Sequence, residues 1–243
     1  MKLFGLIGYP LGHSFSKKYF DKKIEDGHLI DCSFELFPLK KIENYLQIKE
    51  SDSNLQGLAV TIPYKEKIIP FLSSISETAK EIGAVNCIKI DGDITIGYNT
   101  DVIGFKKSLA PLLQSHHTMA LVLGTGGASK AVQFVLNKMD IPFLLVSRRK
   151  MEFAITYDQL DEQIIASHFL IINCTPLGMT PNEDDMPHLP YEYLSSKHLL
   201  YDLIYKPEKT KFLQQGEKYG CQIKNGFEML ILQAEENWKI WNS

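Results

Sequence analysis

Short apolar runs alternate with stretches of helical apolar spacing along most of this chain. The runs predict buried strands, and the stretches between them predict amphipathic helices. In the first part of the chain, strands are expected at 3–7, 33–36, 87–90 and 94–98, the last two forming a hairpin around Asp91-Gly92-Asp93. Helices are expected at about 17–25, from 39, at 76–82 and from 102. This alternation is the pattern of an α/β domain.

The second part of the chain contains a glycine-rich turn. An apolar run over 119–123 breaks into Gly124, Gly126 and Gly127, after which a helical spacing resumes. A strand, a tight glycine turn and a helix can hold a nucleotide, because Gly124 permits the sharp turn and Gly126 lets backbone N–H groups approach a pyrophosphate. Ser129 is small enough for the helix to touch the strand, and the helix N-terminus adds positive charge. A purely structural turn is the alternative for this stretch alone.

A second apolar run at 143–146 ends in the basic segment Ser147-Arg148-Arg149-Lys150. An NAD-binding unit normally has an Asp or Glu here for the ribose 2′-hydroxyl. Arginine can instead bind the 2′-phosphate of NADP and stack on the adenine, so the segment favours NADP over NAD, with a solvated basic loop as the alternative. Further strands are expected at 168–173, 199–204 and around 223, and helices at 157–166, with a capping box of Thr156 and Gln159, at 209–219 and at 226–240.

Lys65 and Asp101 are candidates for proton chemistry. Pro63 suits the first position of a helix running to about residue 71, which would place Lys65 in the first turn. A lysine at the positive end of a helix, beside Thr61, suits proton transfer near neutral pH, although many such lysines are only solvated. Asp101 precedes an apolar-periodic helix and is expected as its N-cap. Its carboxylate can also pair with Lys65, if the fold brings the two together.

Other polar residues stand where a ligand could be bound. Ser14 and Ser16 lie where the first loop leads into the first helix, so either is expected as an N-cap. These hydroxyls, with the neighbouring His13, could also hold a polyhydroxylated or carboxylated ligand. Gln233 interrupts the apolar stripe of the final helix, either as a polar residue at its edge or as a ligand contact.

Composition and charge narrow the classes of partner. With 243 residues, 44% of them hydrophobic, the chain can bury a large core, and we favour two small domains over one large one. A net charge of −3 indicates neither nucleic acid nor an anionic membrane, which leaves a small molecule. No signal peptide or membrane span is expected. The four widely spaced cysteines are typical of reduced thiols in a cytoplasmic protein, and the histidine spacing predicts no metal site.

Segments spread over nearly the whole chain match one family in order and spacing. They are Ser14-Phe15-Ser16, Val60-Thr61-Ile62-Pro63 with Lys65, Gly83-Ala84-Val85-Asn86, Asn99-Thr100-Asp101, Gly124-Thr125-Gly126-Gly127-Ala128, Asn173-Cys174-Thr175-Pro176-Leu177-Gly178-Met179, Tyr201-Asp202-Leu203-Ile204-Tyr205, and Gly226 with Met229-Leu230 and Gln233. Together they resemble the shikimate dehydrogenase family. Several motifs in one register are far more specific than any one of them.

The resemblance implies the reversible reduction of 3-dehydroshikimate to shikimate with NADPH, on the chorismate route to the aromatic amino acids. It implies Lys65 and Asp101 as the catalytic pair, with Lys65 as proton donor and acceptor. The implied substrate contacts are Ser14, Ser16, Thr61, Asn86, Asp101, Tyr205 and Gln233. The implied cofactor contacts are Gly124, Thr125, Gly126, Gly127, Ala128, Ser129, Ser147, Arg148, Arg149, Leu203 and Gly226. No arginine stands among the substrate positions, so hydroxyls would bind the substrate carboxylate.

The implied architecture is an N-terminal α/β substrate-binding domain, residues 1–101, which the C-terminal helix 226–243 joins. A Rossmann-like NADP-binding domain follows at 102–225, with the active site in the cleft between the domains. The crossover after Arg149 is shorter than usual in the family, which leaves the strand order and the adenine wall open. The chain is expected as a monomer or a homodimer. The alternatives are a quinate/shikimate dehydrogenase that uses NAD, a non-catalytic ligand sensor, and a folate-type dehydrogenase with the same two-domain plan.

Overall fold

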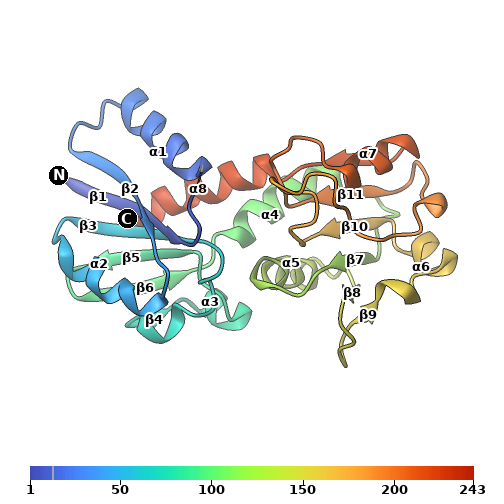
Figure 1. Cartoon of the computed structure of the whole chain (residues 1–243), viewed down its shortest axis with the longest axis horizontal. Helices are drawn as coiled ribbons and strands as arrows, with labels where there is room; N and C mark the ends of the chain where they lie inside the picture. The colour runs from blue at the N-terminus through green and yellow to red at the C-terminus, as the bar shows by residue number, and fades with distance from the viewer. Residues whose placement is uncertain (13) are drawn as a thin grey trace. The chain divides into compact units, whose positions relative to one another are not determined.

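The structure is a computed structural model, and it describes residues 1–12 and 14–243. These form two compact units, Met1–Thr100 with Ala234–Ser243, and Asp101–Gln233, each built on a six-stranded sheet (Figure 1). The helix α8 (Phe227–Trp241) contributes to both, so residues 226–233, which we expected with the first domain, lie in the second unit. Among the described residues, no helix is both long and apolar enough to cross a membrane.

The first sheet is mixed and has the order β2-β1-β3-β5-β6-β4. Its parallel part consists of β1 (Lys2–Gly8), β2 (Cys32–Pro38) and β3 (Leu55–Val60). The predicted hairpin is confirmed as β5 (Cys87–Asp91) and β6 (Ile94–Tyr98), and β5 is antiparallel to β3. The short edge strand β4 (Ser74–Ile75) runs parallel to β6.

Successive side chains of the strands point to opposite sides of the first sheet, and helices bury both of its faces. One face is covered by η1 (Ile42–Asn44), α2 (Tyr45–Ser51) and α3 (Glu77–Ile82). The other face is covered by α1 (Phe15–Asp26) and the end of α8. There the rings of Phe4 and Trp241 stack with centroids 5.1 Å apart, and those of Phe20 and Phe34 with centroids 4.6 Å apart.

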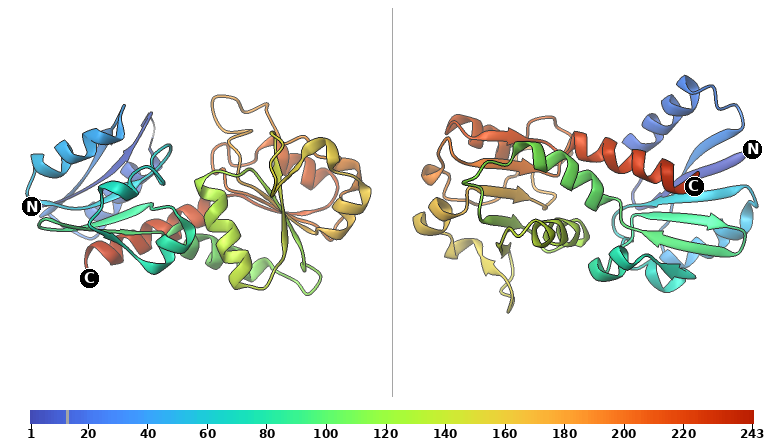
Figure 2. Two further views of the ribbon diagram at one scale, coloured as in Figure 1. Left: turned by 90° about the horizontal axis from the view of Figure 1, so that it is seen from below. Right: turned by 180° about the vertical axis from the view of Figure 1, so that it is seen from behind.

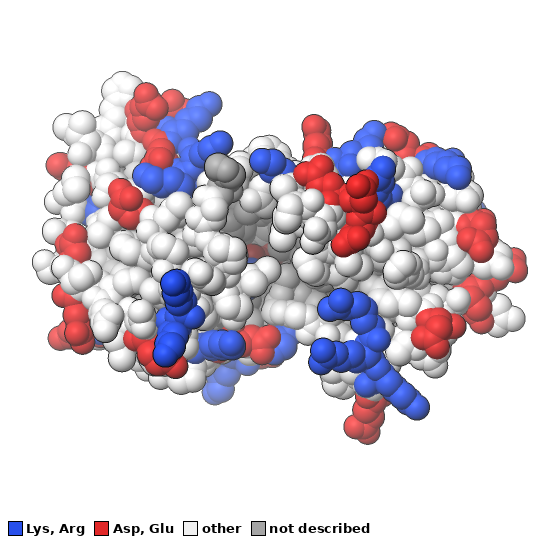
Figure 3. Space-filling model, in the orientation of Figure 1, with Lys and Arg blue, Asp and Glu red and all other residues white. Residues whose placement is uncertain are grey.

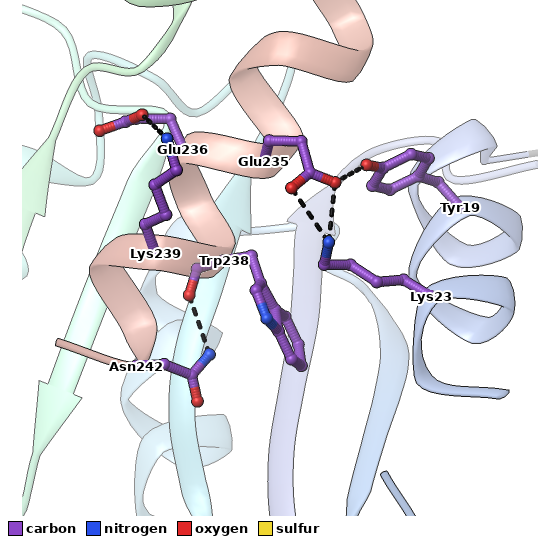
Figure 4. Close-up of polar contacts among 7 residues, drawn as sticks. All are labelled: Tyr19, Lys23, Glu235, Glu236, Trp238, Lys239 and Asn242. Atoms are coloured by element: carbon purple, nitrogen blue, oxygen red, sulfur yellow. Dashed lines mark hydrogen bonds and ion pairs between the residues drawn. The ribbon is translucent and has the colours of Figure 1, made fainter. Parts of the chain in front are cut away.

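Polar contacts of Glu235 hold α1 against α8 beside this aromatic core (Figure 4). The Glu235 carboxylate accepts hydrogen bonds from Lys23 Nζ, at 2.8 and 3.0 Å, and from the Tyr19 hydroxyl. Burial alone would raise the pKa of Glu235, but the hydrogen bonds from Lys23 and Tyr19 outweigh it and lower that pKa. Because the Glu235 side chain is 36% exposed, the ion pair stabilises the fold by about 1 kcal/mol or less.

The helix expected at 63–71 is absent, so that prediction is wrong. Residues 65–68 form turns, and only η2 (Ile69–Phe71) is helical, of the 3-10 type. The Lys65 carbonyl accepts the N–H of Val85 at 2.7 Å, and the N–H of Ile69 bonds to Glu66 instead, at 3.3 Å. Pairing with a neighbouring segment therefore replaces the helix, and the helix dipole offers no argument about Lys65.

The second sheet is entirely parallel, in the order β12-β11-β10-β7-β8-β9. Its strands are β7 (Ala120–Leu123), β8 (Phe143–Ser147), β9 (Ile155–Thr156), β10 (Leu170–Asn173), β11 (Leu199–Asp202) and β12 (Gln222–Lys224). Read from β9 to β12, the order by chain position is 3-2-1-4-5-6, that of a Rossmann-type dinucleotide-binding sheet. The short crossover therefore preserves the strand order, with β9 reduced to two residues.

Helices cover both faces of this second sheet as well (Figure 2). On one face lie α4 (Asp101–Leu109), which continues into η3 (Ala110–Leu112), and α5 (Gly127–Lys138). On the other face lie α6 (Glu162–Ser167), α7 (Lys211–Lys218) and η5 (Tyr191–Tyr193).

The single helix expected at 157–166 is divided in two. The predicted capping box of Thr156 and Gln159 is present, but it opens only the short η4 (Tyr157–Gln159). Asp161 then caps a second helix, α6, because its Oδ1 accepts the N–H of Ile164 at 2.8 Å. A strong N-cap inside the apolar pattern thus starts a new helix instead of continuing the first.

Candidate active site

One edge of the first sheet collects the loops that carry most of the predicted substrate residues. β1 and β3 end at this edge, β5 begins there, and β6 ends there. Backbone hydrogen bonds join the loops: the N–H of Thr61 bonds to Ile7 at 2.9 Å, and the N–H of Asn86 bonds to Tyr98 at 3.0 Å. The topology therefore places Thr61, Asn86 and the residues after Tyr98 along the same edge.

Lys65 lies beside Asn86 in this edge, because its carbonyl bonds to the N–H of Val85. The segment 83–86 reaches it through Gly83, which ends α3 in the left-handed conformation at φ +70°. The Lys65 side chain is half-buried. Two of the predicted chemical groups, an ammonium and an amide, thus come from adjoining loops of one sheet.

The predicted N-cap at Ser14 is confirmed, since its Oγ accepts the N–H of Lys17 at 3.5 Å. Ser16 is the second residue of α1, and both serines are half-buried. Their role in ligand binding stays a prediction. His13, from the same loop, lies outside the described residues.

The glycine turn of the second unit leaves room in front of a helix N-terminus. Gly124 has φ +100°, which favours glycine, and its N–H bonds to Val146 at 2.8 Å. Gly126 precedes α5 as its N-cap without a side-chain bond, and a Cβ there would meet no atom within 4 Å. Space is therefore open beside Gly126, where α5 and its first N–H groups begin, as binding of a phosphate requires. Ser129 is fully buried where helix and strand touch.

The arginine turn follows directly after β8. The hydroxyl of Ser147 accepts the N–H of Arg149 at 3.2 Å, which shapes this turn, while Arg148 and Arg149 are exposed. Figure 3 shows basic side chains gathered over this part of the second unit. No acidic residue stands among residues 147–151, where a carboxylate would repel a 2′-phosphate. Exposed guanidinium groups and open helix N–H groups together fit NADP.

A buried polar network, whose members the sequence analysis gave no role, holds the loops after β10 and β11. Asp202 is fully buried, and its carboxylate accepts hydrogen bonds from Asn173 Nδ2 at 3.0 Å, the Ile204 N–H at 3.0 Å and the Thr210 hydroxyl at 2.6 Å. Burial raises the pKa of Asp202 to about 7, although these three donors oppose the rise. The sequence feature that could have predicted this network is the polar residue that ends each of the two apolar runs, Asn173 and Asp202.

Leu203 and Gly226 meet through their backbones just beyond this network. The N–H of Leu203 bonds to Asn173 at 3.0 Å, and the N–H of Gly226 bonds to Ile204 at 3.0 Å. A Cβ on Gly226 would clash with the Leu203 carbonyl, so only glycine fits here. Tyr205 follows, half-buried, and burial raises its pKa.

Asp101 and Gln233 come from two helices that pack closely. Asp101 is the first residue of α4 and not the residue before it, so the helix starts one position earlier than expected. One turn further on, a Cβ at Gly104 would lie 3.2 Å from the Cβ of Gln233, which places α8 against this face of α4. Lys65 belongs to the first unit and Asp101 to the second, so their pairing stays a prediction.

Within residues 1–12 and 14–243, no group of three His, Cys, Asp or Glu side chains could hold a metal ion. Thr125, Gly127 and Ala128 complete the turn between β7 and α5 and its first helical residues, and they add no titratable group.

Fold and site together define a class of protein, an α/β chain in which a dinucleotide-binding unit is joined to a unit suited to a small polar ligand. Within that class, the chain belongs to the shikimate dehydrogenase family. Residues 6–88 match the family model described as the shikimate dehydrogenase substrate binding domain.

Relatives match over nearly the whole chain. A shikimate dehydrogenase (NADP(+)) of Staphylococcus aureus is 36% identical in an alignment that covers 99% of this chain and 92% of the relative. The crystal structure of shikimate dehydrogenase from Aquifex aeolicus has a TM-score of 0.88 at 34% identity, covering 100% of this chain and 92% of that one. The Thermus thermophilus enzyme, solved in complex with NADP(H) and shikimate, also has a TM-score of 0.88, at 26% identity, covering 99% and 93% of the two chains.

Proposed function

We propose that this chain catalyses the reversible NADP-dependent interconversion of shikimate and 3-dehydroshikimate, on the chorismate route to the aromatic amino acids. The observation that carries this proposal is the match to NADP-dependent shikimate dehydrogenases over 99% of the chain. The glycine turn and the arginine turn agree with it, because they suit a dinucleotide with a 2′-phosphate. Accordingly, we assign NADP binding to the unit Asp101–Gln233 and substrate binding mainly to the other unit.

The proposed chemistry at the substrate is a coupled loss of hydride and proton from one secondary alcohol. The nicotinamide of bound NADP would supply the hydride transfer in both directions. We assign the proton to Lys65, whose amine takes it from the hydroxyl during oxidation and whose ammonium returns it during reduction. In the reductive direction the ammonium also stabilises the negative charge that develops on the ketone oxygen. Asp101 is assigned to orient Lys65 and to accept a hydrogen bond from the substrate.

The remaining polar side chains are assigned to the hydroxyls and the carboxylate of shikimate. Ser14 and Ser16 would donate hydrogen bonds to the carboxylate from the start of α1. The ring hydroxyls would be bound by Thr61, Asn86, Tyr205 and Gln233. A site with this many donors and acceptors rejects analogues that leave some of them unpaired, which is the source of the specificity we propose.

The cofactor contacts are assigned to loops at one end of the parallel sheet. Residues 124–129 would bind the pyrophosphate, and Ser147, Arg148 and Arg149 would bind the adenosine 2′-phosphate. Leu203 and Gly226, whose backbones touch each other, would line the nicotinamide end.

Absorbance at 340 nm, followed with the purified protein, tests the function directly. We expect NADP⁺ to be reduced with shikimate, much more slowly with quinate, and more slowly when NAD⁺ replaces NADP⁺. Equal rates with quinate and NAD⁺ would instead identify a quinate/shikimate dehydrogenase. Binding of shikimate without turnover would identify a sensor, and turnover of a methylene-folate alone would identify a folate-type dehydrogenase. Each of these outcomes contradicts the proposal.

Two further properties accompany this function. The four cysteines have free thiols, in keeping with our proposal that the protein works in the cytoplasm.

A monomer and a homodimer both allow the reaction, and light scattering coupled to size-exclusion chromatography distinguishes them.

A further inference from the structure

We propose that Asn237, in the C-terminal helix, is a positioning residue for the substrate site. It holds Thr100, and through Thr100 it orients the side chain of Asn86. This inference rests on the proposed function, in which Asn86 contacts the substrate. All three residues belong to the first unit, and they lie 0%, 1% and 3% exposed in the order Asn237, Thr100, Asn86.

The three side chains form a directed series of hydrogen bonds. Asn86 Nδ2 donates to Thr100 Oγ1 at 3.0 Å, and Thr100 Oγ1 lies 2.6 Å from Asn237 Oδ1. The Thr100 hydroxyl has a single proton, and its other acceptor, Asn86 Oδ1, is more distant at 3.2 Å. The proton therefore goes to Asn237, which leaves a lone pair of Thr100 for the amide of Asn86.

The backbone fixes the other end of the Asn86 amide. Asn86 Oδ1 accepts the N–H of Thr100 at 2.7 Å, so both ends of its amide group bond to Thr100. The orientation of that amide decides which of its atoms faces a ligand. If Asn237 cannot accept, the Thr100 proton turns toward the Asn86 amide, where it competes with the hydrogen that Asn86 Nδ2 donates to the same oxygen, and the amide loses its preferred orientation.

The position of Asn237 indicates that the residue serves more than packing. It lies on the helix face that carries Ala234, Trp238 and Trp241, which pack in the aromatic core of the first unit. An apolar residue would complete this stripe, and burying an amide there is costly unless the amide is hydrogen-bonded. The buried amide thus interrupts an apolar stripe at a place where it reaches Thr100, at the substrate edge of the sheet.

The test uses substitutions of Asn237 in the full-length protein. Asn237→Leu removes the acceptor, Asn237→Ser withdraws it from Thr100 without overpacking because the serine side chain is one atom shorter, and Asn237→Asp keeps an acceptor oxygen. The control is Asn242→Ala, because Asn242 is an exposed asparagine just past the same helix. The readouts are KM for shikimate, KM for NADP⁺, kcat, and hydrogen exchange of the Thr100 amide.

We expect Asn237→Leu and Asn237→Ser to raise KM for shikimate roughly three- to tenfold, the effect of one neutral hydrogen bond. KM for NADP⁺ should stay unchanged, and the Thr100 amide should exchange faster. Asn237→Asp should restore both properties toward those of the wild type, and Asn242→Ala should match the wild type. A folded Leu or Ser variant with an unchanged KM for shikimate overturns the proposal, even if its melting temperature is lower. The role of Asn237 is then only structural.

The exchange measurement separates this proposal from the proposed function. If the wild type does not turn over shikimate, the proposed function fails, and Thr100 exchange still reports whether Asn237 holds Thr100. Unchanged exchange in the variants then overturns the inference about Asn237 independently. Faster exchange supports the hydrogen-bond series in the absence of any activity.

Discussion

Lys65 is the side chain on which the proposed proton transfer depends. We expect Lys65→Ala to lower kcat by roughly 10²–10⁴-fold, the usual contribution of a general acid–base group. KM for shikimate should change little, because the hydroxyl and amide side chains still bind the substrate. Steady-state kinetics with shikimate and NADP⁺, alongside shikimate binding by calorimetry, measures both effects.

Lys67→Ala is the matched control for this experiment, because Lys67 is an exposed lysine two residues away. It should behave as the wild type. Near-normal turnover in Lys65→Ala would remove Lys65 from the proton transfer, and lost substrate binding would make it a binding residue instead.

Arg148 is the side chain on which the preference for NADP depends. A charge-assisted hydrogen bond contributes about 1.5–3 kcal/mol, so Arg148→Ala should raise KM for NADP⁺ roughly 10- to 100-fold. KM for NAD⁺, which lacks the 2′-phosphate, should stay within about threefold. Kinetics with both cofactors measures the difference, and Lys150→Ala, the exposed neighbour, serves as control. Equal effects on the two cofactors would contradict the 2′-phosphate assignment.

At the residue scale, the sequence predicted groups whose signal is local. A serine before a helix predicts an N-cap, and Ser14 is one; glycines after a strand predict a turn, and Gly124 has the φ that this requires. Asn237 and Asp202 could not be assigned in this way. Their roles depend on Thr100 and Asn173, which are distant in sequence and near only in the folded chain.

At the element scale, the ends of β10 and β11 depend on the Asp202 network. Burial raises the pKa of Asp202 to about 7 in the folded chain, against 3.8 as its ordinary value. Between these values the folded state holds a proton that the unfolded state has lost, so the network's contribution to stability falls as pH rises from about 4 to 7. The slope approaches 1.4 kcal/mol per pH unit for one group.

We expect Asp202→Asn to remove this slope, because asparagine keeps the shape and one acceptor but does not titrate. The free energy of unfolding of the variant, relative to that of the wild type, should therefore increase as pH rises from 4 to 7. Urea unfolding at several pH values measures the difference, with Asp158→Asn, an exposed residue on η4, as control. A difference that does not depend on pH would contradict a raised pKa.

Helices and strands could be predicted from the sequence where the apolar periodicity was unbroken. The structure contains the strands β1, β2, β5 to β8 and β10 to β12 and the helices α4, α5, α7 and α8, all of which were predicted, whereas β3 and the two-residue strands β4 and β9 were not predicted. The helix predicted from Pro63 failed because the Lys65 carbonyl bonds to Val85, a partner that periodicity does not show. Likewise, the strand order after Arg149 follows from pairing across the sheet, which a short crossover does not reveal.

At the scale of the whole molecule, two buried histidines at the far end of the second sheet link its stability to pH. His117 precedes β7 and His198 precedes β11, so both lie at the opposite end of these parallel strands from the glycine turn. They are 5% and 1% exposed. Their Nδ1 atoms accept the N–H groups of Gln114 and Ser195, each at 3.0 Å.

These bonds require the neutral form of each ring. Because Nδ1 accepts a hydrogen bond, the ring proton is on Nε2. His117 Nε2 donates to the Lys197 carbonyl at 3.1 Å, and His198 Nε2 donates to the Ile165 carbonyl at 3.0 Å. A second proton would place two N–H groups against each other. Burial lowers the pKa of both histidines below 6.5, and of the buried His168 as well.

The sign of the resulting pH dependence follows from these pKa values. Below pH 6.5 the unfolded chain takes up protons that the folded chain does not, so stability is present above pH 6.5 and is lost as pH falls through the lowered values. The loss approaches 1.4 kcal/mol per pH unit for each histidine. We expect His117→Asn and His198→Asn, which keep an acceptor near Nδ1, each to reduce this slope between pH 6.5 and 5 in urea unfolding followed by circular dichroism.

His28→Asn is the control, because His28 is exposed and belongs to the first unit. It should leave the slope unchanged. The two variants should also keep the wild-type KM values at pH 7.5, since both positions lie at the end of the second sheet opposite its glycine turn. A slope that survives in the double variant would show that His168 or the carboxylates dominate acid unfolding, and altered KM values would mean that this end of the sheet is coupled to the site.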